Sequence, residues 1–441
     1  MKIRSSSGQH PWRNWGRSVL AHPQSVEMPA DEGEVAEVLT RAKRDGLTVR
    51  PVGAGHSFTP IAATDGISLR LDRLAGVRSV DAAAGLVRLG AGTRLYDLRG
   101  PLAAHGLALE NMGDIETQTV AGAISTGTHG TGNDFTGLAA QVKALRLVLA
   151  NGDMVDCCET ERPELFQAAR LGLGALGVLT EVTLRCVPAF LLEADERPEP
   201  LAAVLENFDQ IMAGADHVEF YWFPHTSTAL VKANRRLPAT AQPDPLPRWR
   251  SVLDDEILSN GVFGLTCGLG TLMPQVIPPV NRLAARLIGN RRFTDSSQEV
   301  FTSPRRVRFR EMEYAIDREA LPQALSEIRN LIKARGWRIS FPLEIRVAAA
   351  DEVWLSTAYR RASAYVAVHR YRRDPFAGYF LAVQEILLAY GGRPHWGKLH
   401  TLDAGQFRER YPRFDDVLAV RDEVDPDRLF RNAYLDRVLG R

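Results

Sequence analysis

Two glycine-rich stretches in the first third of the chain constrain its fold more than any other feature. The first is VGAGHSF at residues 52–58, directly after a predicted strand, and the second is NMGDIETQTVAGAISTGTHGTG at residues 111–132. Glycine lets the backbone approach a ligand closely, and consecutive amide groups form a nest for an anion. Interleaved Ser and Thr hydroxyls add hydrogen-bond donors. Tight turns would explain either stretch alone, but the two together predict a domain that holds a pyrophosphate.

The better-known phosphate-binding motifs do not fit these stretches. Neither stretch is followed by the Gly-Lys-Ser/Thr of a Walker A loop. A G-x-G-x-x-G pattern occurs at Gly172, Gly174 and Gly177, but a predicted helix precedes it and a predicted strand follows it. That order is the reverse of a dinucleotide-binding fingerprint. The pattern is interpreted as a packing turn, and an NAD-dependent Rossmann enzyme is disfavoured.

Local periodicity predicts an α+β fold in two main parts. The first 190 residues alternate short strands with helices, including a helix that begins near Asp31 and ends at Gly46. A hairpin is predicted to turn at Asn151-Gly152, and residues 177–187 alternate as the closing strand of this region. The other strands predicted here are 25–29, 47–52, 67–71 and 85–92.

A change in composition near residue 200 marks the second α+β part. RPEPL at residues 197–201 is predicted to be a linker, and charged helices and aromatic strands follow it. The segment 239–249 is predicted to be a proline-rich loop, and Arg305–Arg310 is interpreted as one solvated face of a strand. Strands are predicted at 218–223, 307–314, 339–347 and 365–371, and helices near 317–335 and 376–390.

Composition narrows the function classes. The 441 residues are 45% hydrophobic and 24% charged, which is typical of soluble globular proteins of two or three domains. A formal net charge of +1 gives no reason to expect nucleic acid as a partner. The N-terminus lacks an apolar signal segment, so a cytoplasmic location is expected. The cysteines fit neither a zinc spacing nor a disulfide framework, and no metal site is predicted; they are Cys157, Cys158, Cys186 and Cys267.

Residues 261–280, GVFGLTCGLGTLMPQVIPPV, carry no charge and come nearest to a membrane segment. They contain three prolines and four glycines, which make a poor transmembrane helix. We predict a buried loop or short buried elements here, and no membrane association is expected.

Four motifs in a fixed order carry a family resemblance over nearly the whole chain. They are VGAGHSF (52–58), TVAGAISTGTHGTG (119–132), GALGVLTEVTL (174–184) and RPHWGK (393–398). The set resembles FAD flavoproteins of the vanillyl-alcohol-oxidase type, and within them the sugar-acid lactone and alditol oxidases. The resemblance implies an α+β fold with a two-subdomain, PCMH-type FAD-binding domain at 1–190. It also implies a substrate domain over the flavin at 191–400, and a C-terminal segment, 401–441, that returns to the FAD domain.

The resemblance also implies which residues hold the cofactor. The histidine of the G-x-G-H-S motif is bonded covalently to the flavin 8α-methyl group in the resembling oxidases, and it corresponds to His56. Such a bond replaces the anchoring that reversible binding must supply and raises the redox potential of the flavin. The implied cofactor-binding residues are Gly53, Ala54, Gly55, His56, Ser57, Phe58, Gly113, Thr119, Gly122, Ala123, Ser125, Thr126, Gly127, His129, Gly130, Val178 and His395.

The substrate side is expected to stabilise an alkoxide as hydride leaves for the flavin. Side chains repeat every two residues along a strand, so Glu344 and Arg346 share one face; a surface ion pair is the simpler alternative. The resembling enzymes hold this pair and the lysine of HWGK, Lys398, beside the substrate. Arg346 and Lys398 would bind and polarise the reacting hydroxyl. Glu344 would orient Arg346 and accept the proton.

Three further residues bear on the substrate. His369 and Tyr371 share another strand face, and the resemblance places both near the substrate, with His369 in a catalytic role. Alditol oxidases carry threonine at the Tyr371 position and serine at the Asp114 position, so the chain resembles the L-gulonolactone and D-arabinonolactone oxidases more closely. The implied reaction oxidises the C2 hydroxyl of an aldono-1,4-lactone, giving an ascorbate-type product. The alternatives are an alditol oxidase attacking a polyol such as xylitol, and a non-catalytic flavin-binding module.

Gly113 bears on the electron acceptor. By resemblance it faces flavin C4a, where galactonolactone dehydrogenases hold an alanine thought to exclude oxygen. Glycine has no Cβ to obstruct that path, although a turn with positive φ would also explain it. We therefore predict an oxidase that reduces O2 to hydrogen peroxide. A dehydrogenase that uses a cytochrome or quinone is the alternative.

Overall fold

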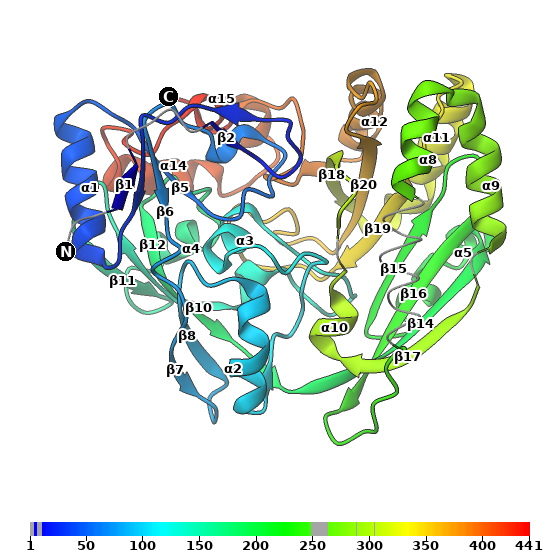
Figure 1. The fold of residues 1–441 in the computed structure, drawn as a ribbon, viewed down its shortest axis with the longest axis horizontal. Helices are drawn as coiled ribbons and strands as arrows, with labels where there is room; N and C mark the ends of the chain where they lie inside the picture. Colours follow the sequence, from blue (N-terminus) through cyan, green and yellow to red (C-terminus); the bar gives the residue numbers. More distant parts are fainter. Residues whose placement is uncertain (1–3, 7–10, 248–262, 288, 304) are drawn as a thin grey trace.

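The computed structural model describes residues 4–6, 11–247, 263–287, 289–303 and 305–441, and it folds into two lobes (Figure 1). The first lobe contains the N-terminal strands and helix α1 (Glu32–Arg44), and the second contains the largest sheet. The predicted first helix is confirmed as α1. The Asp31 side chain caps it by accepting a hydrogen bond from Glu34 N at 2.9 Å.

Two sheets form the centre of the first lobe. Their strands are β1 (Arg4–Ser6), β4 (Ser25–Met28), β5 (Val49–Val52), β6 (Ile67–Arg70), β7 (Val77–Asp81), β8 (Leu86–Gly90), β10 (Val142–Val148), β11 (Met154–Cys158) and β12 (Val178–Arg185). One sheet has the order β1-β4-β6-β5 and the other β11-β10-β12-β8-β7. The predicted hairpin is confirmed as β10–β11. The predicted closing strand, β12, instead lies in the middle of its sheet, between β10 and β8.

An eight-stranded sheet forms the second lobe, with the order β17-β14-β16-β15-β19-β20-β18-β21. The strands are β14 (Phe190–Pro200), β15 (His217–Trp222), β16 (Thr228–Pro238), β17 (Arg291–Ser296), β18 (Phe309–Asp317), β19 (Leu343–Ala348), β20 (Ser363–Tyr371) and β21 (Arg393–Pro394). Helices α11 (Leu321–Ala334) and α12 (Ala377–Ala389) confirm the two predicted helices. They pack against each other and bury Leu325, Ile328, Val383 and Leu387 in the core.

The predicted linker at 197–201 is wrong, because its first four residues complete β14. That strand pairs with β16 over its whole length, from Phe190 to Pro200. Its prolines suggested a break in structure. However, β17 pairs with β14 only up to Glu196, so beyond that residue one edge of β14 needs no backbone donor. Pro198 is therefore tolerated within the strand.

The second glycine-rich stretch ends at the junction of the two lobes. The Thr131 hydroxyl donates a hydrogen bond to the carbonyl oxygen of Val218 in β15, at 2.5 Å. The backbone amide of Gly132 donates to the carbonyl oxygen of Val347 in β19, at 2.9 Å. This stretch therefore lies directly against the strands that carry the predicted substrate residues.

Two helices cover the uncharged segment, α8 (Phe263–Leu272) and α9 (Ile277–Leu287). The prediction of buried elements at 261–280 is wrong for its described part, 263–280, because α8 buries only Cys267 and Gly270. A segment with no charged residues showed no clear solvent-facing side, so the exposed leucines could not be recognised. No helix in the described ranges is long and apolar enough to cross a bilayer.

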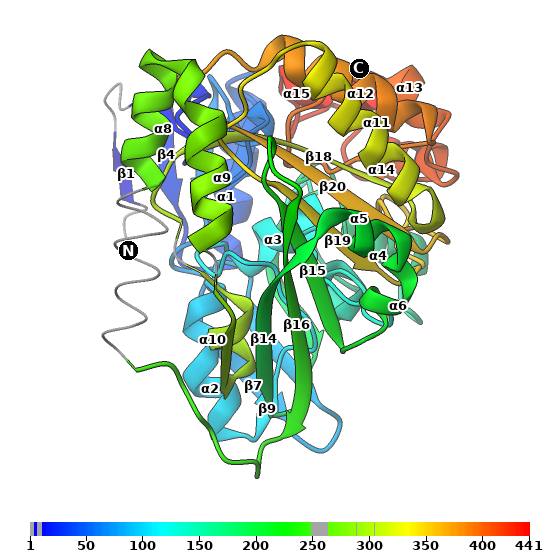
Figure 2. The same cartoon turned by 90° about the vertical axis from the view of Figure 1, so that its right-hand side faces the viewer.

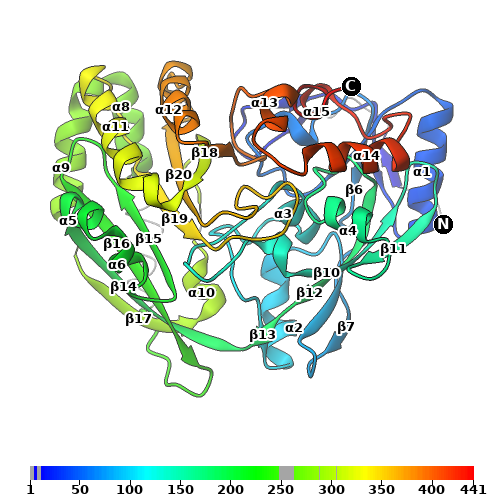
Figure 3. The same cartoon turned by 180° about the vertical axis from the view of Figure 1, so that it is seen from behind.

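The C-terminal segment packs against the first lobe through α13 (Ala404–Arg408), α14 (Phe414–Val424) and α15 (Ala433–Leu439) (Figure 3). The Asn432 side chain donates hydrogen bonds to the carbonyl oxygens of Pro60, Ile61 and Ala63, at 2.9 to 3.1 Å. Arg50 lies in β5, the strand that leads into the first glycine loop, and it donates a hydrogen bond to the carbonyl oxygen of Phe430 at 2.7 Å. The last residues of the chain therefore support the first glycine loop from behind.

Candidate active site

An open cleft runs along the first glycine loop. The predicted cofactor residues on its wall are Gly53, Ala54, Gly55, His56, Ser57, Thr119, Gly122, Ser125 and Thr126. Gly55 has φ +72°, a conformation that favours glycine. A Cβ on Gly53 would lie 2.4 Å from Thr119 Oγ1, so only glycine lets the two stretches approach this closely. Exposed amide groups with Ser and Thr hydroxyls fit the pyrophosphate of FAD.

The G-x-G-x-x-G turn also contributes to this cleft. Gly174 and Gly177 lie on its wall, and the Gly174 carbonyl oxygen accepts a hydrogen bond from Arg50 at 2.8 Å. Interpreting the pattern as a packing turn therefore missed its place beside the predicted cofactor.

Eight of the seventeen predicted cofactor residues do not line the cleft, and four of these lie in the core, at a helix end or in an aromatic cluster. Ala123 and Val178 are fully buried in the hydrophobic core. Gly127 ends helix α3 (Val120–Thr126) with φ +80°. Phe58 packs instead in a small cluster with Phe309 and Phe341.

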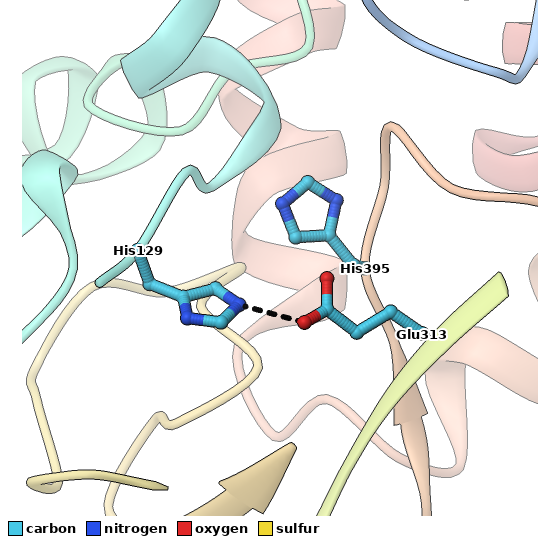
Figure 4. Close-up of side chains that lie close together, drawn as sticks. All are labelled: His129, Glu313 and His395. Atoms are coloured by element: carbon cyan, nitrogen blue, oxygen red, sulfur yellow. Dashed lines mark ion pairs between the residues drawn. The ribbon is translucent and has the colours of Figure 1, made fainter. Parts of the chain in front are cut away.

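The other four predicted cofactor residues, Gly113, His129, Gly130 and His395, lie in or beside the second glycine-rich stretch. Gly113, His129 and Gly130 line a narrow crevice. Figure 4 shows the Glu313 carboxylate close to both His129 and His395, and His129 Nε2 forms an ion pair of 3.3 Å with Glu313 Oε1. Burial opposes ionisation of Glu313, but His129, Lys398 and His395 together outweigh it and lower the pKa of the carboxyl to about 2.

His56 has one ring nitrogen engaged and one free. Its Nε2 lies 2.8 Å from the Thr117 hydroxyl, and its ring stacks on Trp15 with centroids 5.5 Å apart. Nδ1 is buried and has no hydrogen-bond partner among the described residues. Burial, Lys398 and Arg94 lower the pKa of His56 to about 4, so the ring is neutral near pH 7. A neutral ring with an unpaired nitrogen suits a nucleophile.

Arg346 lies among three carboxylates at the junction of the lobes. Its Nη2 binds Glu344 Oε1 at 2.6 Å and also Asp114 Oδ1, and its Nε binds Glu219 Oε2 at 2.8 Å. The Tyr221 hydroxyl donates to Glu219 Oε1 at 3.1 Å. The structure thus brings together the predicted Asp114, Glu344 and Arg346 from a glycine loop and β19. The guanidinium supplies the positive charge that the three buried carboxylates require.

Two of the three carboxylates bound to Arg346 differ in ionisation. Burial raises the pKa of Glu344 to about 7, because Asp114 and Glu219 add to it and Arg346 only partly offsets it. Burial also opposes ionisation of Asp114, but Arg346 and Arg305 outweigh it and lower its pKa. Carboxyls whose pKa values are pushed apart in one site are typical of general acid–base catalysis.

Lys398 and His369 share a second buried carboxylate, Glu311. Lys398 Nζ pairs with Glu311 Oε2, and His369 Nε2 lies 3.5 Å from Glu311 Oε1. Burial lowers the pKa of Lys398, but Glu311 and Glu313 outweigh it and raise that pKa. The ammonium also lies 5.3 Å from the ring centroid of Phe58, beside His56. Tyr371 lies in the aromatic cluster that contains Phe58.

Several side chains of this site were missed from the sequence. Arg305 is exposed, as predicted for the run Arg305–Arg310, but it precedes strand β18 and its Nη2 binds Asp114 Oδ2 at 2.5 Å, so it belongs to the site. Acidic residues within aromatic, apolar strands were the signal for Glu219, Glu311 and Glu313, because a carboxylate alternating with buried side chains must have a partner. The missed residues are Trp15, Thr117, Glu219, Tyr221, Arg305, Glu311 and Glu313.

The cleft, the two glycine-rich stretches and the eight-stranded sheet together define an FAD-dependent flavoprotein of the vanillyl-alcohol-oxidase type. The profile of the FAD binding domain family matches residues 23–158, and that of the D-arabinono-1,4-lactone oxidase family matches residues 182–438. The chain belongs to the D-arabinono-1,4-lactone oxidase family, and its cofactor is FAD.

Similar proteins cover the whole chain. L-gulono-1,4-lactone dehydrogenase of Mycobacterium tuberculosis is 43% identical, over 97% of this chain and 99% of that protein. L-gulonolactone oxidase of Bos taurus is 35% identical, over 97% of this chain and 98% of that protein. Cholesterol oxidase of Brevibacterium sterolicum superposes with a TM-score of 0.80 at 18% identity, over 99% of this chain and 97% of that one. This last likeness confirms the predicted fold class.

Proposed function

We propose that the protein oxidises the C2 hydroxyl of an aldono-1,4-lactone, such as L-gulono-, L-galactono- or D-arabinono-1,4-lactone. The 2-keto lactone formed would enolise to an ascorbate-type product. The observation that carries the proposal is the buried pairing of Arg346 with Glu344, a carboxyl whose pKa is raised to about 7. A buried cation beside a carboxyl that can take up a proton is the equipment for converting an alcohol into an alkoxide.

The chain's own residues divide the work. Bound FAD supplies the hydride acceptor. Arg346 and Lys398 donate hydrogen bonds to the reacting oxygen and stabilise its negative charge, while Glu344 accepts the hydroxyl proton on a carboxylate oxygen. Asp114 and Glu219 hold the Arg346 guanidinium from two sides, and Glu311 holds Lys398.

Anaerobic reduction of the bound flavin tests this substrate class. A panel of lactones and polyols is added to the purified holoprotein, and bleaching of the flavin absorbance is followed. We expect bleaching by at least one aldono-1,4-lactone. Bleaching by xylitol but by no lactone would favour the activity named for a Streptomyces relative that is 32% identical, alditol oxidase. An absence of bleaching by either class would leave a flavin-binding module.

We further propose a covalent bond between His56 and FAD. Nδ1 is the ring nitrogen available for it, since Nε2 is engaged by Thr117. We expect the flavin to remain with the acid-precipitated polypeptide and to give a fluorescent band on a denaturing gel. His56→Ala should lose the band, and the exposed His105→Ala should keep it. Complete release of flavin from the wild type would refute the bond.

A pH profile tests the role of Glu344. A base must be deprotonated to act, and burial raises the Glu344 pKa to about 7. We therefore expect turnover at saturating lactone to be low in acid and to rise with pH through about 7. Glu344→Gln should remove this rise and lower turnover on the order of a hundredfold. An unchanged rise in the variant would assign the titration to another group.

O2 is the proposed electron acceptor, with hydrogen peroxide as product. Gly113 has no positive φ, so the turn explanation for this glycine is wrong. Its backbone instead packs closely against a later part of the same glycine-rich stretch: a Cβ here would lie 3.0 Å from the His129 carbonyl oxygen. We expect stopped-flow mixing of the reduced protein with air-saturated buffer to reoxidise the flavin rapidly, and Gly113→Ala to slow it. Slow wild-type reoxidation that an added cytochrome or dye accelerates would favour a dehydrogenase.

A further inference from the structure

Helices α8 and α9 lie side by side at the outer edge of the second lobe (Figure 2). Six of the ten large hydrophobic side chains that are exposed among the described residues belong to this short region. They are Leu265, Leu269, Leu272, Met273, Leu283 and Leu287. Leu265, Leu272 and Leu287 are 76%, 81% and 74% exposed. Monomeric proteins rarely expose such a concentration of apolar side chains without a partner for it.

Contacts on the inner side of the two helices keep the exposed leucines pointing away from the body of the protein. Cys267 is buried against Phe58 and Phe341. The Asn281 side chain donates hydrogen bonds to the carbonyl oxygens of Pro224 and Ile339, each at 3.0 Å. These contacts anchor α8 and α9 to the body of the protein, so the leucines cannot turn inward without breaking them.

The charges of this region all have one sign. Between Phe263 and Phe293 the sequence contains arginine as its only charged residue, and no Asp or Glu. Arg291 and Arg292 pair with Glu196 and Glu193 of the neighbouring strand β14. Arg282 and Arg286 are different: they are one helical turn apart on α9, exposed, and without an ion pair to any described residue.

We propose that the outer side of α8 and α9 docks on an anionic lipid bilayer. The leucines would enter the boundary between headgroups and acyl chains, and Arg282 and Arg286 would bind lipid phosphates, as in helices that lie in the plane of a membrane. Since no described helix is long enough to span, the attachment is peripheral. This replaces the expectation that the segment avoids membranes, and it is independent of the proposed reaction.

A second copy of the chain fits the same surface less well. A twofold dimer brings the same patch of both subunits together. The free arginines of one copy would then face those of the other, with no acidic residue in the region to balance them. Lipid phosphates supply the missing negative charge.

Vesicle flotation with the full-length holoprotein tests the docking. We expect the protein to float with vesicles of phosphatidylcholine and phosphatidylglycerol in equal parts, and more weakly with phosphatidylcholine alone or at high salt. Leu265→Ser with Leu272→Ser should lower vesicle binding at least about tenfold, given the apolar area each leucine would bury. Arg282→Glu with Arg286→Glu should abolish the preference for anionic vesicles.

A matched control is Met154→Ser, which changes a 46% exposed apolar side chain on β11 of the first lobe. It should bind vesicles as the wild type does. Flavin absorbance and lactone turnover should be unchanged in all these variants, which excludes misfolding as the cause. Wild-type protein that stays unbound, or binding that the α8 and α9 variants leave intact, would overturn the proposal. So would a concentration-dependent dimer that only the leucine variants dissociate, since this would assign the surface to a second copy.

Discussion

Replacing Arg346 with alanine should lower lactone turnover on the order of a thousandfold while FAD stays bound. Removing one donor to a developing oxyanion costs about 10²- to 10³-fold in other enzymes. Here the loss is expected at the upper end, because the same guanidinium also neutralises Asp114, Glu219 and Glu344. Without it, the buried Glu344 would hold its proton more tightly and would no longer be a base near pH 7. Turnover and flavin content are measured on the same preparation.

Arg346→Lys is the matched control for charge. A lysine keeps the positive charge but cannot bind Glu219 and Asp114 with separate nitrogen atoms. We expect it to restore only part of the activity, and the pH profile to show a carboxyl that titrates higher than in the wild type. Near-normal turnover in Arg346→Ala would remove Arg346 from the mechanism and leave a structural ion pair in its place.

The sequence predicted the fold well wherever local patterns were strong. Helix α1 has a cap and an apolar face within 14 residues, and the Asn151-Gly152 hairpin is specified by its turn. Strand β14 was missed because its outer half contains prolines and charges, and its partner β16 begins 28 residues later. Helices α8 and α9 were misinterpreted because exposure depends on what the rest of the chain leaves uncovered. The division into domains at 190 and 400 stays a prediction.

In the candidate site, too, some residues could be predicted from the sequence and others could not. The family resemblance predicted Glu344, Arg346 and Lys398 as site residues. The two-residue repeat of side chains along a strand is enough to place Glu344 and Arg346 on one face. Their supports were not predictable, since each comes from a distant part of the chain: Glu219 lies 127 residues from Arg346, and Glu311 lies 87 residues from Lys398. Only the folded sheet, with β15 beside β19 and with β21, which leads to Lys398, beside β18, brings these charges together.

Changing Glu311 to glutamine should have the second-largest effect, although Glu311 is proposed to act through its neighbours and not on the substrate. Its carboxylate holds Lys398 and His369 at once, and it is the foremost of the groups that raise the Lys398 pKa against burial. Glutamine keeps a hydrogen-bond acceptor but removes the charge, so the Lys398 pKa should fall. Since Lys398 must be protonated to stabilise the alkoxide, we expect turnover to drop about a hundredfold at neutral pH and to be lost at lower alkaline pH than in the wild type.

Glu313→Gln separates this positioning role from a general loss of buried charge. Glu313 lies two residues along the same strand with similar burial, but it pairs with His129 and only influences Lys398 from a distance. It should shift the alkaline loss of activity much less than Glu311→Gln does. Glu311→Leu, by contrast, leaves a buried ammonium unpaired, which costs about 3–5 kcal/mol of folding stability in comparable cases. If Glu311→Gln and Glu313→Gln gave the same pH profile, the specific role of Glu311 in keeping Lys398 protonated would be refuted. The pKa of Lys398 would then depend on the charges of the whole site.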